Sequence, residues 1–176
     1  DVRNAEAVSV AGQLSIRWAE RAVNQYLNKI LETENDDYVL ASDTDSLYVT
    51  LDSLVQKVGL TDTNKIIEFM DKVCEGKIQN VIDGCYGEMA EYVNAFQQKM
   101  VMKREVLAEV GIWTGKKHYI LNVHNSEGVQ YDEPKLKIMG IEAVKSSTPE
   151  PCRNALKEAF KIMMNGTEED VINYIE

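Results

Sequence analysis

Asp43 and Asp45 are the residues of this sequence whose type and spacing are best suited to chemistry. They lie two apart in YVLASDTDSLYVTL (38–51), between two short runs rich in apolar, β-branched and aromatic residues. Such runs predict strands, and the Asp-Thr-Asp between them predicts a tight turn. Residues two apart in extended backbone point the same way, so the spacing predicts two carboxylates directed at one point. Hard oxygen ligands of this kind suit Mg²⁺, and without a cation they repel each other.

The same pair also has a purely structural interpretation. Aspartate is common in turns because its side chain bonds nearby backbone groups, and most Asp-x-Asp turns bind nothing. On spacing alone, that interpretation is favoured. The rest of the chain has to decide between a turn and a metal site.

A second segment of interest is WTGKKHY (113–119). Adjacent Lys116 and Lys117 follow a glycine, and Tyr119 lies two residues further on. This pattern can place positive charge and an aromatic ring beside a phosphate backbone. A solvated lysine pair at a hairpin edge, where lysine discourages edge pairing, is the favoured explanation when the segment is taken alone.

The net charge of −10 is unevenly distributed over the 176 residues. Residues 1–98 carry 8 basic and 17 acidic side chains, residues 99–137 carry 7 and 5, and residues 138–176 carry 4 and 7. Non-specific DNA binding depends on local contacts of lysine and arginine with phosphate. The total therefore excludes only a uniformly basic surface, and the segment 99–137 is the basic part.

Helical and extended patterns alternate along the chain. Apolar residues at spacings of three and four predict helices over about 4–31, over 61–73 with an N-cap in Thr61–Thr63, and again after a break at Gly76. From Met100 the period changes and predicts strands over 100–110, 119–123 and 136–141. The turn signal Asn125–Gly128 predicts that 119–123 pairs with 129–131.

The last part of the chain is helical again. Thr148 followed by Pro149 predicts a cap and a first-turn proline ahead of a helix over 154–164, which Asn165-Gly166 ends before a helix opened by Thr167. The order predicts an α+β fold, an antiparallel sheet with helices on one face, followed by a small helical segment that begins near 145–148.

Composition sets further bounds on the class of protein. Apolar residues make up 44% and charged residues 27%, which is ordinary for a soluble globular protein. No apolar run approaches the ~20 residues that span a bilayer, and no signal-like segment opens the sequence. Cys74, Cys85 and Cys152 have no metal-ligand spacing, which indicates reduced thiols, with Cys74 and Cys85 as core residues. We therefore expect a cytoplasmic protein without membrane contact.

Several motifs resemble one family in the same order. Asp43-Thr-Asp45-Ser followed by Leu-Tyr-Val resembles the metal-binding palm motif of family B DNA polymerases, and Lys116-Lys117-x-Tyr119 resembles the motif with which these enzymes grip the primer–template duplex. The stretches 132–140 and 145–149 resemble the palm-to-thumb passage of the T-even phage type, and 1–4 resembles the stretch after the fingers. Together these motifs cover nearly the whole chain.

The resemblance implies a palm domain over 1–144 and the start of a thumb over 145–176 of a DNA-directed DNA polymerase. It implies that Asp45 is the direct ligand of two Mg²⁺ ions, that Asp43 supports the site, and that Glu105 is a further palm carboxylate. It assigns Lys116, Lys117 and Tyr119 to the duplex grip. Glu105 is alternatively a strand residue paired with Arg104. Ser146, Ser147 and Thr148 either contact phosphate or cap a helix.

The resemblance also implies parts that this chain lacks. The metal site would share its two Mg²⁺ ions with an aspartate outside this chain, and the fingers that hold the dNTP are absent too. Implied partners are primer–template DNA, dNTP and the rest of the polymerase (fingers, exonuclease and N-terminal palm), with a sliding clamp as a further candidate. If the chain is phage-encoded, its setting is the host-cell cytoplasm. We expect this chain alone not to polymerise DNA.

One departure and two alternatives remain. The family has Tyr-Gly ahead of Asp-Thr-Asp, whereas this chain has Ala41-Ser42, and serine narrows the allowed backbone where glycine permits close approach. A non-catalytic DNA-binding or interaction module on a palm scaffold is the first alternative. Another palm-type enzyme, such as a nucleotide cyclase, is the weaker one, because no second carboxylate pair occupies a comparable turn.

Overall fold

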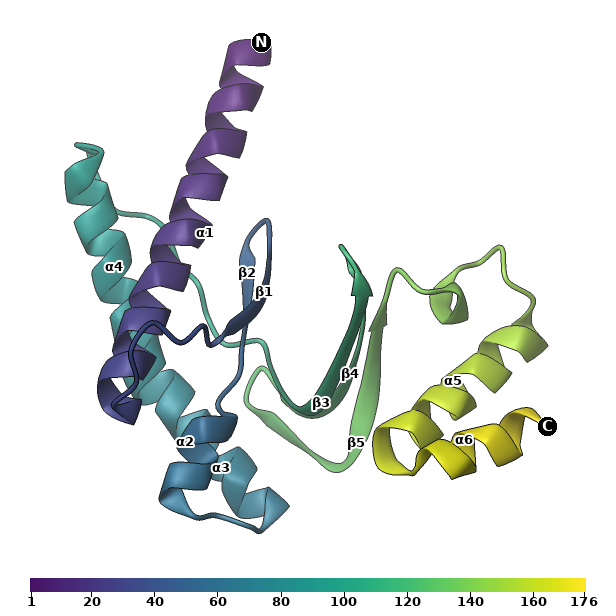
Figure 1. The fold of residues 1–176 in the computed structure, drawn as a ribbon. Coiled ribbons are helices and arrows are strands. Elements are labelled where there is room, and N and C mark those ends of the chain that lie inside the picture. Colours follow the sequence, from purple (N-terminus) through teal and green to yellow (C-terminus); the bar gives the residue numbers. More distant parts are fainter. The chain divides into compact units, whose positions relative to one another are not determined.

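The computed structural model describes residues 1–176, which form two compact units, 1–104 and 105–176 (Figure 1). The predicted α+β class is confirmed. The strands, however, are divided between a two-stranded and a three-stranded antiparallel sheet, where one sheet was expected. No helix is both long and apolar enough to cross a membrane.

The first unit is built on a long helix, α1 (Val2–Leu31). Asp1 caps it by accepting a hydrogen bond from the Arg3 amide at 2.9 Å, and Glu32 ends it in the left-handed region at φ 61°. The predicted apolar stripe is confirmed over the second half of the helix, where Ile16, Ala19, Val23 and Leu27 are buried. The first half is exposed, so packing fixes only the part of α1 beside the rest of the unit.

The predicted hairpin over 38–51 is also confirmed. Strands β1 (Val39–Asp43) and β2 (Ser46–Val49) pair antiparallel, with Asp43 opposite Ser46. Tyr38, Val39 and Leu51 at the base of the hairpin are buried in the same core cluster as α1. Hydrophobic contacts thus anchor the base of the hairpin, and the tip lies at the other end of a five-residue strand.

The remaining helices of the first unit depart from expectation in two places. A short helix, α2 (Asp52–Val58), was not predicted. The Asp62 carboxylate caps α3 (Thr63–Val73) as expected, by accepting from the Lys65 amide at 2.9 Å. The expected break at Gly76 is wrong, because a π-helical turn (Cys74–Ile78) carries α3 directly into α4 (Gln79–Tyr92).

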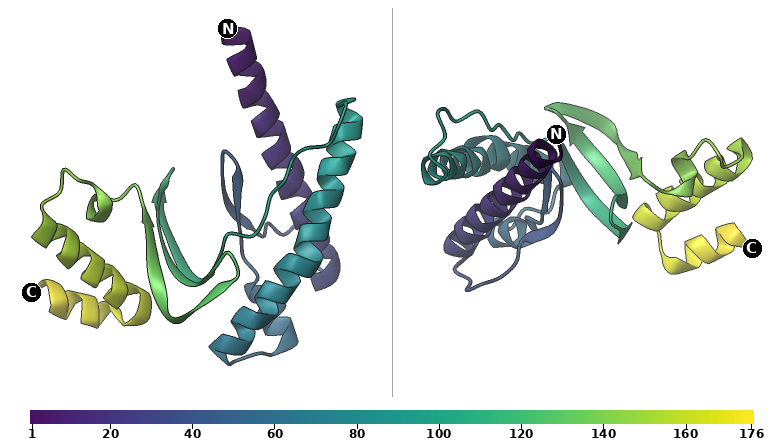
Figure 2. Two further views of the ribbon diagram at one scale, coloured as in Figure 1. Left: turned by 180° about the vertical axis from the view of Figure 1, so that it is seen from behind. Right: turned by 90° about the horizontal axis from the view of Figure 1, so that it is seen from above.

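The π-helical turn explains why the chain needs no break. A π turn adds a residue to the helix without interrupting it. Ile78 thereby stays buried in line with Ile82, Cys85, Tyr86 and Met89 of α4. Figures 1 and 2 show α4 side by side with α1, and this pair forms the main helical layer of the unit.

The second unit begins with a three-stranded meander. Strands β3 (Val106–Gly115), β4 (His118–Ser126) and β5 (Val129–Met139) lie in the order β3-β4-β5. The strand expected over 100–110 starts only at Val106, and residues 129–131 and 136–139 belong to one strand. The predicted turn after Asn125 is confirmed, with Glu127 at φ 50° and Gly128 at φ 86°. Ile120 and Leu121 of the central strand are almost fully buried.

The chain ends in two helices. A 3-10 turn (Glu142–Val144) leads to α5 (Glu150–Asn165), which stops at Gly166, and α6 (Glu168–Ile175) follows. The helix start predicted at Thr167 is confirmed, and Thr167 and Asp170 form a capping box there. Thr148 does not cap α5, because the cap residue is Pro149 and no side chain bonds the first turn. The boundary expected between residues 144 and 145 stays a prediction.

Candidate functional site

Asp43, Thr44, Asp45 and Ser46 form a hairpin turn, which we call the acidic turn. Thr44 and Asp45 are its two loop residues, and Asp43 and Ser46 are the last paired positions. The Thr44 hydroxyl donates to Asp43 Oδ1 at 3.0 Å, and the Ser46 hydroxyl donates to the Asp43 carbonyl at 3.1 Å. Both bonds are local, and the one from Thr44 contacts the Asp43 side chain.

The backbone of the acidic turn is strained at Thr44. Its φ is 51°, in the left-handed region that β-branched residues avoid. Such conformations cost about 1–3 kcal/mol and cluster at functional sites. Asp45 follows within the turn, where its side chain is exposed, and Asp43 is half-buried at the end of β1.

This placement corrects one step of the sequence argument. Strand alternation was expected to direct Asp43 and Asp45 to one side, but Asp45 is a loop residue and alternation does not apply to it. The turn places both residues at one tip of the hairpin, two positions apart. That they face a common ion stays a prediction.

The donor set of the acidic turn suits a hard cation. Carboxylate oxygens are the usual protein ligands of Mg²⁺, which takes near-octahedral coordination and keeps several waters. No group of three or more histidine, cysteine, aspartate or glutamate side chains in the chain is arranged to hold a metal ion. Asp43 and Asp45 are of the residue type that Mg²⁺ takes, and a Mg²⁺ site at this turn stays a prediction.

Ala41 and Ser42, just ahead of the turn, lie in ordinary strand backbone. They pair with Tyr48 and Leu47 of β2, and neither has a positive φ. The backbone at Ser42 thus uses no conformation that only glycine allows. A bulge between Val39 and Ala41 is the one irregularity of this short ladder.

Glu105 forms its ion pair with a residue other than the expected Arg104. It is exposed, immediately precedes β3, and forms an ion pair with Lys137 of β5. Arg104, the expected partner, instead pairs with Asp71 and lies 3.6 Å from a Glu75 carboxylate oxygen. The alternative interpretation of Glu105 as the partner of Arg104 is therefore wrong, and its role near a metal stays a prediction.

The second candidate site is the hairpin turn Gly115–His118, which we call the basic turn. Lys116 and Lys117 are its two loop residues, both exposed, and Lys117 has φ 61°. The end of β5 approaches this turn closely at Gly140, whose φ is 71°. A Cβ built there would overlap the Lys117 carbonyl oxygen and the His118 ring. Only glycine therefore fits beside the turn.

Tyr119 supports the basic turn from inside the sheet. Its side chain is 7% exposed, and its ring centroid is 6.5 Å from that of Trp113 on the neighbouring strand. Little of the ring is open for stacking in this structure.

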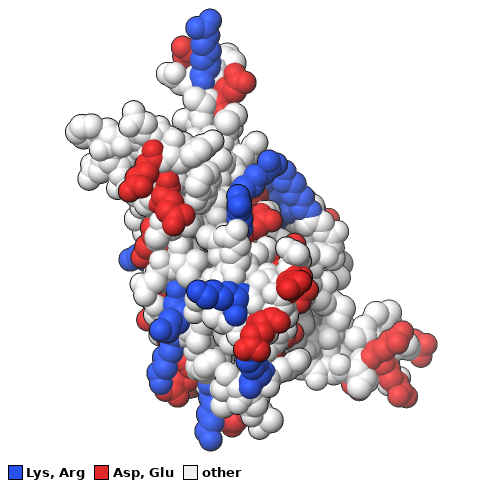
Figure 3. Space-filling view, turned by 60° about the vertical axis from the view of Figure 1, so that its left-hand side comes forward, with Lys and Arg blue, Asp and Glu red and all other residues white.

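The surface charge is mixed on the face shown in Figure 3. Lysine and arginine side chains are interspersed there with acidic ones, so positive charge on this face is local.

Ser146, Ser147 and Thr148 lie in the connection between the 3-10 turn and α5. The two serines are exposed, and the Thr148 amide donates to the Lys145 carbonyl at 3.2 Å. Since α5 takes no side-chain cap, the capping alternative for these residues is wrong. Their contact with phosphate stays a prediction.

The cysteines behave as the sequence indicated. Cys85 is buried and Cys74 half-buried, and burial raises the pKa of each thiol to about 11. Thiolate is the reactive form, so these two side chains are poor nucleophiles near neutral pH.

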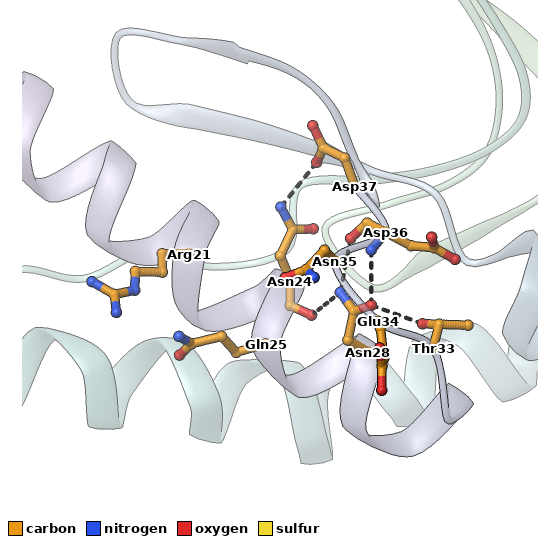
Figure 4. A pocket seen from close by; sticks show the side chains of 9 residues that line it. All are labelled: Arg21, Asn24, Gln25, Asn28, Thr33, Glu34, Asn35, Asp36 and Asp37. Carbon is orange, nitrogen blue, oxygen red and sulfur yellow. Dashed lines mark hydrogen bonds between the residues drawn. The ribbon is translucent and has the colours of Figure 1, made fainter.

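Sequence reasoning missed a polar network where α1 leads into β1. Asn24 and Asn28 of α1 bond the segment 33–38, and the surrounding residues line an open pocket of about 550 Å³ (Figure 4). The available signal was two asparagines four residues apart inside a helix. Asparagine is a weak helix former, so this spacing points to side chains with another task.

Comparison with known proteins gives one consistent answer. Residues 29–174 match the family model for divergent family B DNA polymerase. The DNA-directed DNA polymerase of Escherichia phage RB69 is 45% identical over 179 residues, covering 96% of this chain and 20% of that protein. The DNA-directed DNA polymerase of Enterobacteria phage T4 is 39% identical over 185 residues, covering 99% of this chain and 21% of that protein. The chain thus spans about a fifth of the length of these curated relatives, and it belongs to the divergent family B DNA polymerases.

Proposed function

We propose that this chain is the C-terminal palm and the start of the thumb of a DNA-directed DNA polymerase. It would carry half of a two-metal nucleotidyl-transfer site on the acidic turn and a duplex grip on the basic turn, for replicative DNA synthesis. The observation that carries the proposal is the strained turn that presents Asp43 and Asp45 in a chain of this family.

In this proposal Asp45 provides a carboxylate oxygen to Mg²⁺ from its exposed position in the turn. Asp43 supports it, with its own carboxylate oriented by the Thr44 hydroxyl. When bound, two Mg²⁺ ions would activate the primer 3′-hydroxyl and neutralise the charge developing on pyrophosphate. Glu105 is the further carboxylate of the palm, and Lys137 holds it by an ion pair.

Lys116 and Lys117 would neutralise phosphates of the primer–template duplex. Each such contact releases a counterion, so binding weakens as salt rises. The exposed Ser146 and Ser147, with Thr148, would add hydroxyl contacts to phosphate. None of these contacts reads base identity, as expected of an enzyme that copies any sequence.

The proposed partners follow from the length of the relatives. The remaining ligands, including an aspartate, and the fingers that hold the dNTP would come from the rest of the polymerase, with its exonuclease and N-terminal palm. A sliding clamp is a further candidate partner, and the host-cell cytoplasm is the proposed setting. We expect residues 1–176 alone to give no template-dependent primer extension.

The decisive test replaces Asp45 by asparagine in the complete polymerase. Losing a metal ligand removes several kcal/mol of transition-state stabilisation, so single-turnover extension should fall about a thousandfold. Duplex affinity should stay unchanged, because Lys116 and Lys117 are intact. The matched control is Asp52→Asn, which removes another exposed carboxylate in the first turn of α2 and should leave extension at the wild-type rate.

Near-normal extension by the Asp45→Asn polymerase would refute the metal-ligand role. If the same variant also binds duplex normally, and Lys117→Ala weakens that binding, the chain is a DNA-binding module on a palm scaffold. Extension by residues 1–176 alone would contradict the assignment to part of a site.

A further inference from the structure

We propose that Asn24 and Asn28 of α1 are positioning residues for the acidic turn. They clamp the backbone that enters β1 and so set where Asp43 and Asp45 are presented. This inference rests on the proposed function, since it concerns the same metal site. The pair of side chains is called the asparagine clamp below.

Asn24 holds the first residues of the hairpin with both ends of its amide. Its Oδ1 accepts from the Tyr38 amide at 2.9 Å, and its Nδ2 donates to Asp37 Oδ1 at 2.9 Å. The same Asp37 oxygen accepts from the Val39 amide at 3.0 Å. Two consecutive backbone amides at the entry to β1 are thereby tied to one helix side chain, directly or through Asp37. Figure 4 shows the bond between Asn24 and Asp37.

Asn28, one helical turn further on, holds the preceding loop. Its Oδ1 accepts from the Asp36 amide at 2.9 Å and from the Thr33 hydroxyl at 2.8 Å. Its Nδ2 donates to the Asp36 carbonyl at 2.8 Å. The Thr33 hydroxyl also lies 2.8 Å from the Tyr38 hydroxyl, which links the two halves of the clamp.

The clamp acts where the chain enters β1, beside the buried Tyr38, Val39 and Leu51 that also anchor the hairpin. A two-stranded sheet alone is marginally stable, so its position depends on its anchors. Val39 is four residues before Asp43, or about 13 Å in extended backbone. A strand transmits a shift at its base to its tip, and a sub-ångström shift is enough to misplace a metal ligand.

The clamp forms part of the lining of the pocket around it. Its asparagines and Asp37 form hydrogen bonds with one another and with the backbone (Figure 4). A ligand that used these side chains would have to break these bonds. Two weak helix formers, Asn24 and Asn28, therefore lie in the last two turns of α1, beside the chain that they hold.

The test exchanges donor and acceptor in the hydrogen bond between residues 24 and 37 of the complete polymerase. Asn24→Asp keeps the acceptor for the Tyr38 amide but sets two carboxylates against each other, at positions 24 and 37. Adding Asp37→Asn removes the repulsion, because an amide nitrogen at position 37 can donate to the carboxylate introduced at position 24. In the wild type one Asp37 oxygen accepts from both Asn24 and the Val39 amide, so the double variant regains only part of the network. Gln25→Glu is the matched control, since it adds one charge at the same exposed surface and breaks no hydrogen bond of the clamp.

Two readouts separate positioning from folding. The first is hydrogen exchange of the peptide 36–47 without metal, where Asn24→Asp should raise exchange while α4 stays protected. The second is the Mg²⁺ concentration for half-maximal extension, measured well below the unfolding temperature, which should rise about tenfold on loss of one such contact. The double variant should return both part of the way to the wild-type values, and Gln25→Glu should change neither.

The possible outcomes distinguish this inference from the proposed function. If Asp45→Asn abolishes extension but Asn24→Asp leaves Mg²⁺ dependence and exchange unchanged, the positioning role is wrong and the metal site stands. Failure of the double variant to recover either readout also overturns the clamp. If Asp45→Asn extends primers normally, the proposed function itself fails.

Discussion

The acidic turn and the basic turn are both two-residue hairpin turns with a non-glycine residue in the left-handed region. Their supports differ. The acidic turn ends a short hairpin whose base is buried under α1 and tied to the asparagine clamp. The basic turn ends two long strands, and Gly140 lets β5 approach it within contact distance. The acidic turn is thus supported at the base of its hairpin, and the basic turn is supported by the neighbouring strand β5.

The third hairpin turn of the chain is a reference for the other two, because no function is proposed for it. Between β4 and β5 the two loop residues are Glu127 and Gly128, and both have positive φ. Two-residue hairpin turns favour such angles, and glycine at the second position relieves the strain. In the two turns with proposed functions, the residues with positive φ are Thr44 and Lys117, so neither turn places a glycine there. Glu127 shows that a non-glycine residue with positive φ also occurs in a turn without a proposed function.

Gly140→Ala should disrupt the support of the basic turn, and we expect it to lower the free energy of unfolding more than the other substitutions below. Left-handed backbone costs a non-glycine residue about 1–2 kcal/mol, and displacing the Lys117 carbonyl and the His118 ring adds to it, for about 3 kcal/mol in total. Urea unfolding of the complete polymerase, followed by a probe in residues 105–176, measures the change. Duplex affinity should fall with it, and the exchange of peptide 36–47 should stay as in the wild type.

Gly128→Ala is the control for that comparison. Gly128 has φ 86°, but a Cβ there would meet no atom within 4 Å. It should therefore cost only the backbone strain, about 1 kcal/mol, and leave duplex binding intact. Equal effects of the two substitutions would mean that the close approach of β5 does not support the basic turn.

Lys117→Ala should remove a positive charge of the basic turn without changing its structural support at Gly140. Removing one phosphate contact should weaken duplex binding by about 1 kcal/mol and reduce the slope of log K against log salt by about 1. The measurement is a titration of duplex at several salt concentrations. Lys65→Ala removes an exposed lysine from α3 and should change neither value. An unchanged slope for Lys117→Ala would remove the basic turn from the DNA interface.

The sequence predicted the elements that depend on local pattern. Periodicity located α1, alternation and turn residues located the β1–β2 hairpin, and Asp62 and Thr167 marked two helix starts. The short helix α2 carries too few turns for a period to be visible. The strand expected from Met100 begins late because residues 100–104 join no strand ladder, and strand pairing is not a local property.

The features of the candidate site are likewise of two kinds, those that local sequence predicted and those that it did not. The types and spacing of Asp43, Asp45, Lys116 and Lys117 identified both turns, because charged residues in a turn are a local signal. Three features depend on contacts across the fold: the asparagine clamp, the role of Gly140 and the pairing of Glu105 with Lys137. No short window of sequence contains both partners of such a contact. The structure was needed to find them.

Thr44→Gly should have the smallest effect on stability, and it tests whether the strain in the acidic turn serves its function. Glycine relieves the strain at φ 51°, and its greater freedom in the unfolded chain offsets part of that gain, so stability should rise by about 0.5 kcal/mol. The change also removes the hydroxyl that orders Asp43, so single-turnover extension should fall although the protein is more stable. Lys117→Gly makes the matched change in the basic turn, where a similar gain should accompany weaker duplex binding and an unchanged Mg²⁺ requirement. If both glycine variants kept wild-type activity and affinity, the strain would serve neither turn, and the contrast with Gly128 would reflect stability alone.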